Sequence, residues 1–285
     1  MLNMSRITLF LIALLIVFTS CGHQDNDWYR IRKIDSKTYI ISEPKSSQSN
    51  SCFLIMGSKE AILFDSGTGE NRSESLNKIL GTLTDLPVTL LLSHFHFDHI
   101  GNINEFNCIG IPEIPEVEDK LSGDSLLYLT SEETLVKKTA NVKISKRFQV
   151  GKDIDLGNRK IKILHTPGHS KESISIIDHE KEYVFTGDLI YNGLLLIDDC
   201  NAYVNSINQI IEKSTSKYRF FGAHGKPETG YERLFKIKDA IEYYRSDSCS
   251  VKPFRQISFF GTTKNVYKIA DISFIDGYSD AFNND

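Results

Sequence analysis

Several features that define large classes of protein are missing from this sequence. No two of its five cysteines form a CxxC pair, so a zinc site built from cysteines is not expected. The formal net charge of -4 gives no electrostatic basis for binding nucleic acid. No segment is of low complexity, and a hydrophobic share of 40% with a charged share of 25% is typical of a folded chain. The 285 residues suffice for one large domain or two small ones.

The apolar run near the N-terminus is too short to cross a membrane. Residues 7–18 form a run of twelve residues that is apolar except for Thr8, whereas about 20 are needed to span a bilayer. One basic residue, Arg6, precedes the run and Thr19-Ser20-Cys21 follows it, which is typical of a signal peptide. The small pair before Cys21 resembles the lipobox of bacterial lipoproteins, which implies that Cys21 is lipidated and becomes the mature N-terminus. An ordinary cleaved signal and an uncleaved anchor are the alternatives.

Each of these alternatives takes the chain out of the cytoplasm. With a lipidated Cys21 the protein would be a membrane-anchored lipoprotein facing the periplasm or the cell exterior. In an exported protein the remaining cysteines could form two disulfides, whose pairing the sequence leaves open. Cys52 lies inside an apolar segment and is expected to be an isolated buried thiol. The other three are Cys108, Cys200 and Cys249.

The densest group of chemically active side chains is residues 93–101, which read S-H-F-H-F-D-H-I-G and hold three of the eight histidines. The group directly follows the apolar run 88–92, which predicts a buried strand that ends in a loop. In α/β folds such loops carry the chemistry. Imidazole and carboxylate donors at this density suit a divalent ion such as zinc. The alternative is a histidine-rich surface loop.

Strand geometry predicts how these donors are arranged. Because alternate residues of an extended chain share a side, His94, His96 and Asp98 are expected to point together. Phe95 and Phe97 would then pack on the opposite side. His99 would lie where the chain turns and would approach from a second direction.

The surrounding pattern predicts a mixed sheet. A hairpin over 29–41 and strands over 52–56 and 61–64 precede a helical pattern over 73–83, which indicates a βαβ crossover into 88–92. Residues 111–115 contain two prolines and are not expected to form a regular element. The polar segment 116–138 is interpreted as a lid or a substrate-side insertion.

Four more histidines or aspartates stand at predicted strand ends, each beside glycine or another small residue that permits close approach of a ligand. Taken singly, each has another explanation: the aspartates could cap helices, and the histidines could lie in a turn or an exposed loop. Together they indicate one site. The four are Asp65, His169, Asp188 and His224.

The pattern HxHxDH over residues 94–99, followed by Gly101 and these later residues in order, resembles the metallo-β-lactamase fold superfamily of metallohydrolases over about 29–244. The resemblance implies an α/β fold, a four-layer αββα sandwich of two mixed β-sheets with helices outside. It implies that one metal is held by His94, His96 and His169, and a second by Asp98, His99 and His224. Asp188 would bridge the two metals, and Asp65 would orient ligands by hydrogen bonds.

The resemblance also implies the chemistry. Two divalent ions, most consistent with Zn²⁺ and with Fe or Mn as alternatives, would share a hydroxide that attacks a carbonyl or phosphoryl centre, and Asp98 would help to orient it. Asp188 stands where one lactamase subgroup carries cysteine, so the chain is more similar to glyoxalase II thioesterases, lactonases, the lactamases that lack this cysteine, and ribonuclease Z. Residues 165–170, which read H-T-P-G-H-S, look most like the glyoxalase II and lactonase branch. Tyr191 is either an oxyanion donor or a core residue.

We therefore predict a lipid-anchored hydrolase of an ester, thioester, lactone or β-lactam bond in a small molecule. The alternatives are a surface lipoprotein that uses the fold only for binding, and an iron-dependent, sulfur dioxygenase-like oxidoreductase. The predicted organisation is a signal peptide over 1–20, a tether over 21–28, the main domain over 29–250, and a C-terminal extension over 251–285. That extension alternates like two strands and shows no chemistry of its own.

Overall fold

The computed structural model describes residues 24–25, 28–71, 73–135, 140–246 and 250–281. The predicted signal peptide and Cys21 lie outside these residues, as does Cys249. In the described part of the chain, no helix is both long and apolar enough to cross a membrane. Cys52, Cys108 and Cys200 are free thiols, and Cys52 is buried as expected.

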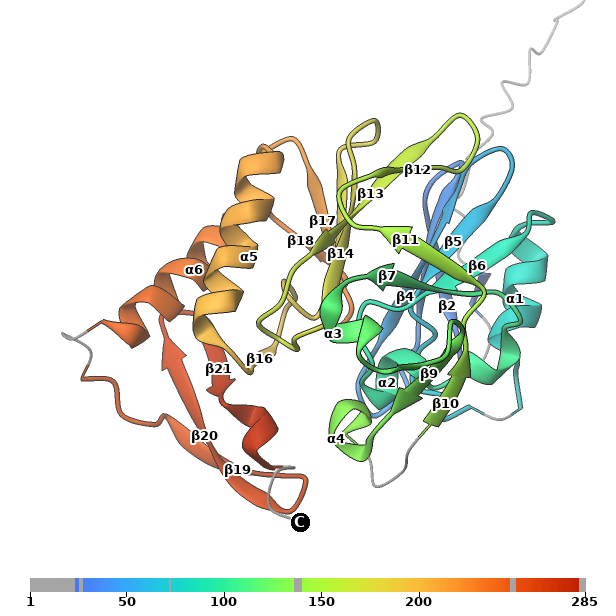
Figure 1. Ribbon diagram of the computed structural model, residues 1–285. Coiled ribbons are helices and arrows are strands. Elements are labelled where there is room, and N and C mark those ends of the chain that lie inside the picture. The colour runs from blue at the N-terminus through green and yellow to red at the C-terminus, as the bar shows by residue number, and fades with distance from the viewer. Residues whose placement is uncertain (1–23, 26–27, 72, 136–139, 247–249, 282–285) are drawn as a thin grey trace, which may run out of the picture.

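Two β-sheets packed face to face form the centre of the molecule (Figure 1). The first has eight strands in the order β1-β2-β3-β4-β5-β6-β7-β11 and the second has six in the order β12-β13-β14-β15-β17-β18. The first comprises β1 (Gln24–Asp25), β2 (Arg30–Asp35), β3 (Thr38–Ser42), β4 (Ser51–Met56), β5 (Ala61–Phe64), β6 (Val88–Leu91), β7 (Ile109–Glu113) and β11 (Lys146–Gln149). The second comprises β12 (Asp153–Asp155), β13 (Lys160–His165), β14 (Ile174–Asp178), β15 (Tyr183–Gly187), β17 (Arg219–Gly222) and β18 (Glu228–Thr229).

An apolar core fills the space between the sheets. It includes Phe53, Phe64, Phe185 and Phe221, whose rings are inaccessible to solvent. β4, β5, β14 and β15 are buried along their whole length, because both faces of each sheet are covered. Continuous rather than alternating apolar runs are the sequence signature of such strands.

Helices cover the outer faces. α1 (Leu76–Leu83) packs on the first sheet, and α5 (Cys200–Lys213) and α6 (Glu232–Arg245) pack on the second (Figure 1). Ser75 caps α1 and Asp199 caps α5 by accepting backbone N–H groups. The predicted αββα sandwich is confirmed.

Two parallel crossovers determine where the functional side chains lie. The chain runs from β5 through α1 to β6, and from β15 through α5 to β17, and each pair of strands is parallel. Parallel neighbours end at the same edge of a sheet, so the residues that follow these four strands meet at one edge.

One prediction about the first sheet is wrong. Residues 111–115 do form regular structure: Pro112 lies in β7, and Pro115 is the first residue of α3 (Pro115–Glu118). On the side of β7 that faces β6, only Ile109 and Gly110 are paired. Pro112, which has no N–H to donate, lies beyond them, where this side of β7 has no partner strand. Within the predicted tether over 21–28, residues 24–25 form β1 and pair with β2.

Two peripheral sheets flank the central pair. The first of these is a three-stranded sheet, built from the predicted insertion and the residues after it. Its strands are β8 (Leu121–Ser122), β9 (Leu126–Leu129) and β10 (Ala140–Lys143), and α4 (Ser131–Thr134) lies between β9 and β10 in the chain. The C-terminal residues form three strands, not two, which join β16 and are followed by η2 (Tyr278–Ala281). This four-stranded sheet comprises β16 (Leu194–Ile197), β19 (Arg255–Phe259), β20 (Thr262–Ile269) and β21 (Ile272–Asp276).

Candidate functional site

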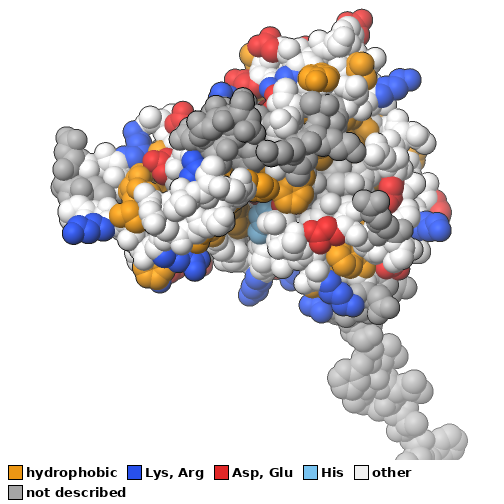
Figure 2. All heavy atoms as spheres, turned by 90° about the horizontal axis from the view of Figure 1, so that it is seen from below, with side chains coloured by type: hydrophobic (Ala, Val, Ile, Leu, Met, Phe, Trp, Pro, Cys, Tyr) orange, Lys and Arg blue, Asp and Glu red, His pale blue; other side chains and the backbone are white. Residues whose placement is uncertain are grey.

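All the predicted site residues from position 65 onward converge at one edge of the two sheets. Asp65 follows β5, the histidine cluster follows β6, His169 follows β13, Asp188 follows β15 and His224 follows β17. Figure 2 shows histidine at the floor of a hollow that hydrophobic side chains border. Eight imidazole and carboxylate groups from segments remote in sequence therefore share one small volume.

The first group of donors is a triangle of three buried imidazoles. His94 Nε2 lies 2.9 Å from His96 Nδ1, and His169 Nε2 lies 3.1 Å from the former and 3.0 Å from the latter. A tetrahedral zinc ion with Zn–N bonds of about 2.0–2.1 Å would hold three such nitrogens about 3.4 Å apart. The spacing is therefore close to what one zinc ion requires.

The outer nitrogen of each imidazole in this triangle has an acceptor. His169 Nδ1 donates to the carbonyl oxygen of Leu196 at 2.9 Å, and His94 Nδ1 donates to Ser93 Oγ at 2.9 Å. His96 Nε2 lies 3.2 Å from the hydroxyl of Tyr278. With their protons on the outer nitrogens, the inner nitrogens present three lone pairs to one another, which repel unless a cation lies between them.

The second group of donors contains Asp98, His99 and His224. Asp98 Oδ2 lies 3.7 Å from His99 Nε2 and 3.5 Å from His224 Nε2. His99 Nδ1 donates to Asp65 Oδ2 at 2.8 Å, and His224 Nδ1 donates to the carbonyl oxygen of Gln48 at 3.0 Å. Both imidazoles thus direct the other nitrogen into the site.

Asp188 lies between the two groups. Its Oδ2 is 2.9 Å from His224 Nε2 and 3.5 Å from His169 Nε2, and its Oδ1 is 3.4 Å from His99 Nε2. His99 Nε2 and Asp188 Oδ1 are both buried, and neither has a hydrogen-bond partner within the described residues. Because an unsatisfied buried polar atom is costly, this orphaned pair fits an arrangement completed by a cation.

Burial and mutual charge shift the pKa values of these groups in the metal-free protein. Burial, with the charges of neighbouring imidazoles, lowers the pKa of His94 and of His96 well below the usual value. His224 behaves in the opposite way: although burial opposes protonation, Asp188 and Asp98 raise its pKa to about 9. Burial also opposes protonation of His99, but the negative charges of Asp188 and Asp65 outweigh it and raise the pKa of His99. Burial opposes ionisation of Asp188, but His224 and His99 lower its pKa.

Asp65 and Asp188 are not helix caps, because the caps of the following helices are Ser75 and Asp199. Asp65 has a φ of 70°, a left-handed conformation that is uncommon outside glycine. It accepts hydrogen bonds from Ser93 N at 2.6 Å and Ser93 Oγ at 2.8 Å in addition to His99. Asp65 therefore orients two imidazoles, His99 directly and His94 through Ser93.

The local geometry of the histidine cluster differs from the strand prediction. Extended backbone ends at His96, and the helical turn α2 (Phe97–Ile100) carries Asp98 and His99. Phe95 is buried in the core as expected, but Phe97 is not packed beside it, because the helical turn rotates Phe97 toward a cavity next to the site. Alternation of sides applies only while the chain stays extended.

Two supporting residues could not be identified from the sequence. Asn50 is fully buried, donates to the carbonyl oxygen of Asp98 and pairs as a β-bridge with His224. Tyr278, in the C-terminal segment that was expected to carry no chemistry, donates to the carbonyl oxygen of His169 at 2.6 Å and accepts from His96. Neither residue lies near a recognisable motif, so no local signal marks it.

Tyr191 is a core residue. Its hydroxyl donates to the carbonyl oxygen of Leu194 at 2.5 Å and accepts from Leu196 N at 3.2 Å. Its ring is buried and packs edge-on against His224 at 5.1 Å. The hydroxyl is thus engaged by backbone groups.

Comparison with known proteins gives a consistent family assignment. The family model described as Metallo-beta-lactamase superfamily matches residues 47–224. The human acyl-coenzyme A thioesterase MBLAC2 is 25% identical over 214 residues, which cover 65% of this chain and 76% of that protein. The atrochrysone carboxyl ACP thioesterase of Aspergillus fumigatus is 25% identical over 169 residues, which cover 57% of this chain and 47% of that protein.

A solved structure shows the same fold. The metallo-beta-lactamase from Pontibacter korlensis superposes with a TM-score of 0.60 at 16% sequence identity, covering 75% of this chain and 99% of that chain. Fold and family therefore agree with the geometry of the site.

Proposed function

The chain belongs to the metallo-beta-lactamase superfamily, and we propose that it is an enzyme that hydrolyses an ester or thioester bond of a small molecule at a centre of two divalent cations. The family and the curated relatives support a metal-dependent hydrolase. The observation that carries the proposal is the convergence of seven ligand-type side chains around buried atoms that lack a partner in the described structure. The thioesterase relatives favour a thioester, and lactones and β-lactams are the other candidate substrates.

The residues divide into two ligand sets. His94, His96 and His169 would hold one cation; Asp98, His99 and His224 would hold the other, with Asp188 shared between them. Bound divalent cations would supply Lewis acidity and bring the pKa of water in the site toward about 7. Imidazole and carboxylate donors suit zinc best, and they also accept iron or manganese.

The chain's own groups would then orient and move protons. Asp98 borders the cavity beside the site and its side chain is 7% exposed, so it can accept a proton from the attacking water. The water oxygen adds to the carbonyl carbon, and the carbon–sulfur or carbon–oxygen bond breaks with its electron pair on the leaving atom. The proton held by Asp98 passes to that atom, so a carboxylic acid and a thiol or alcohol result.

A substrate panel tests the proposal. Zinc-loaded protein should hydrolyse at least one of a set of thioesters, lactones and β-lactams, and iron- and manganese-loaded protein should be assayed in parallel. His96→Ala should reduce hydrolysis to the background rate because it removes one of three imidazoles from the first set. His179→Ala is the matched control, since His179 is exposed and bonds only Tyr218 among the contacts described. Turnover retained in His96→Ala would remove His96 from the site.

We also propose that the protein is exported and held on a membrane by a lipid on Cys21. The support is the sequence of the N-terminal segment, an apolar run followed by Thr19-Ser20-Cys21. Cys21→Ser should move the protein from the membrane to the soluble fraction after cell lysis, and Cys108→Ser should not. Membrane attachment that persists in Cys21→Ser would contradict a lipid on this residue.

A further inference from the structure

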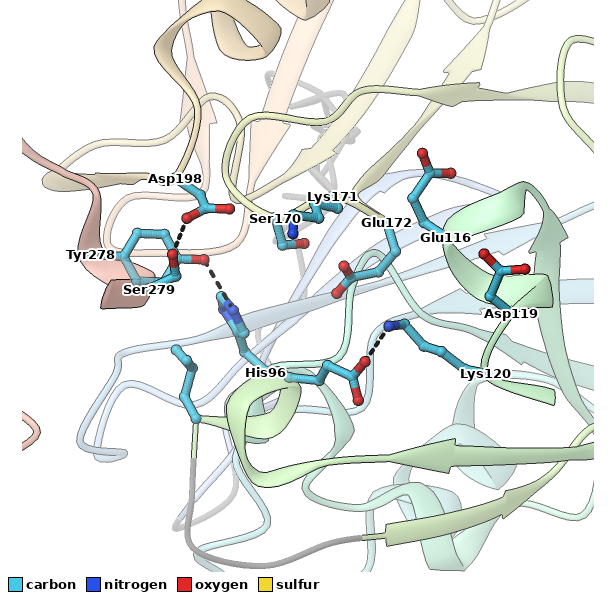
Figure 3. A pocket seen from close by; sticks show the side chains of 12 residues that line it. His96, Glu116, Asp119, Lys120, Ser170, Lys171, Glu172, Asp198, Tyr278 and Ser279 are labelled. Carbon is cyan, nitrogen blue, oxygen red and sulfur yellow. Dashed lines mark hydrogen bonds and ion pairs between the residues drawn. The ribbon is translucent and has the colours of Figure 1, made fainter. Parts of the chain in front are cut away.

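Two cavities meet at the candidate site, and they differ in chemistry. One, of about 350 Å³, lies against Asp98, Asp188 and His224. The other, of about 560 Å³, is lined mainly by polar and charged side chains, including Lys120, Lys171 and Glu172 (Figure 3). His96 and Leu135 border both cavities. A substrate whose reacting bond lies at the site can therefore extend one arm into each.

Apolar side chains from four separate segments line the smaller cavity. Phe97 comes from the helical turn after His96, Leu135 follows α4, and Leu194 and Leu196 come from β16. Phe259 is the last residue of β19 in the C-terminal sheet, and Phe260 follows it. The volume is near the lower end of the range of about 300–1,000 Å³ that is usual for small-molecule sites.

The aromatic side chains form a continuous wall from the site outward. The Phe97 ring lies edge-on to that of Phe260 at 6.3 Å, and the Phe259 and Phe260 rings are 4.8 Å apart. Phe259 in turn contacts Tyr278 at 6.1 Å. The apolar surface is thus joined to Tyr278, which bonds directly to His96.

The backbone at the tip of the hairpin indicates that this wall is not incidental. Phe259 pairs with Thr262, and the two residues between them, Phe260 and Gly261, have φ angles of 46° and 85°. Such two-residue turns favour Asn, Asp or Gly at the first central position, and a bulky residue there is strained. Phe260 nevertheless occupies it, with 47% of its surface exposed, and borders the cavity. Strain of this kind concentrates at functional sites.

We propose that the smaller cavity is an acyl-binding subsite, so that the natural substrate carries an uncharged hydrocarbon chain on its carbonyl carbon. The polar cavity then receives the polar leaving group. This assignment rests on the proposed hydrolase function for turnover, but binding of the hydrocarbon chain does not depend on turnover. The bond hydrolysed is the carbon–sulfur or carbon–oxygen bond of the substrate, and the products are a carboxylic acid and a thiol or alcohol.

The test compares acyl chains of increasing length. Acetyl, butanoyl and hexanoyl thioesters of N-acetylcysteamine share one leaving group and differ only in the acyl chain. For the zinc-loaded protein, kcat/KM should rise about three- to fourfold for each methylene buried. Phe260→Ala should flatten this rise, so that the hexanoyl thioester loses more of its kcat/KM than the acetyl thioester does. Phe254→Ala is the matched control, because Phe254 is 60% exposed and does not line the cavity.

A binding experiment separates this inference from the proposed activity. Butanoate, hexanoate and octanoate should bind the zinc-loaded protein with affinity that increases with length, measured by calorimetry, and Phe260→Ala should weaken the longest most. If no thioester, lactone or β-lactam of the panel is cleaved but this length dependence holds, the hydrolase proposal fails and the apolar subsite stands. Equal affinities for the three acids, or a length dependence unchanged in Phe260→Ala, would overturn the subsite. A dependence found only when the leaving group is lengthened would overturn its assignment to the acyl chain.

Discussion

Tyr278 shows how a residue far from any motif can complete a site. Its hydroxyl donates to the carbonyl oxygen of His169 and so is left to accept from His96 Nε2, which fixes the tautomer that directs Nδ1 inward. Its ring also stacks on His169 at 5.5 Å. One side chain thus holds two of the three imidazoles of the first ligand set.

Tyr278→Phe should keep the ring and lose the hydroxyl. We expect about a 10- to 100-fold loss of affinity for the first cation, as is usual when the hydrogen-bond partner of a ligand is removed. Competition with a chromophoric chelator measures this affinity. Tyr128→Phe is the control, because Tyr128 is 47% exposed and lies in the peripheral sheet. Equal affinities in the two variants would show that Tyr278 only fills space.

Protons compete with the second cation. In the metal-free protein the pKa of His224 is raised to about 9 by Asp188 and Asp98 despite burial, so His224 is protonated at pH 7.5. The pKa of His99 is raised in the same way. A cation must displace these protons in order to bind.

Affinity for the second cation should therefore increase as the pH rises toward about 9, where His224 loses its proton in the metal-free protein. At pH 7.5, calorimetric titration with zinc in two buffers of different ionisation enthalpy should reveal proton release. Affinity increases with pH because protonation of His224 favours the metal-free state. Heats that are the same in both buffers, or affinity that falls with rising pH, would contradict these protonation states.

At the scale of elements, the turn between β13 and β14 places His169 by packing against α5. Gly168 has a φ of 131°, and a Cβ there would lie 2.4 Å from the backbone of Tyr203 in α5. The carbonyl oxygen of Gly168 also accepts from Asp198 N and Asp199 N, the residues that lead into α5. Side-chain placement in the site thus depends on a close contact between a turn and a helix.

Gly168→Ala should lower the free energy of unfolding by more than about 1 kcal/mol, because alanine is strained at this φ and meets α5. It should also weaken metal binding, since His169 is the next residue. Gly81→Ala is the control: Gly81 lies in α1 with open space around it, and alanine there should be neutral or stabilising. Thermal unfolding of both variants, with and without zinc, measures the effects. If Gly168→Ala unfolds at the same temperature as the unmodified protein, with and without zinc, the turn can move away from α5.

Considered as a whole molecule, a mixed sheet with chemistry at its strand ends could be predicted from local patterns, and the αββα sandwich could be predicted from the resemblance that the HxHxDH pattern carries. Continuous apolar strands ending in His, Asp and Gly, such as the segment before Asp65 or Asp188, mark where chemistry lies. The direction of Phe97 and Asp98 could not be predicted, because the change from strand to helical turn at His96 depends on tertiary packing. Tyr278 and Asn50 were missed because their roles arise from contacts across the fold.

The cluster also links metal binding to the stability of the whole fold. Seven ionisable groups lie close together, and the orphaned pair His99 Nε2 and Asp188 Oδ1 has no partner in the described residues. Ions that bind only the folded state stabilise it by mass action, so chelation should lower the melting temperature. The C-terminal segment, which supplies Tyr278 and Phe260, should loosen first.

The most direct measurement is the metal content of the purified, folded protein, determined by mass spectrometry alongside its hydrolytic activity. We predict close to two divalent ions per chain, with activity that is lost on chelation and restored by zinc. A folded preparation that contains no metal and retains full activity would contradict the account.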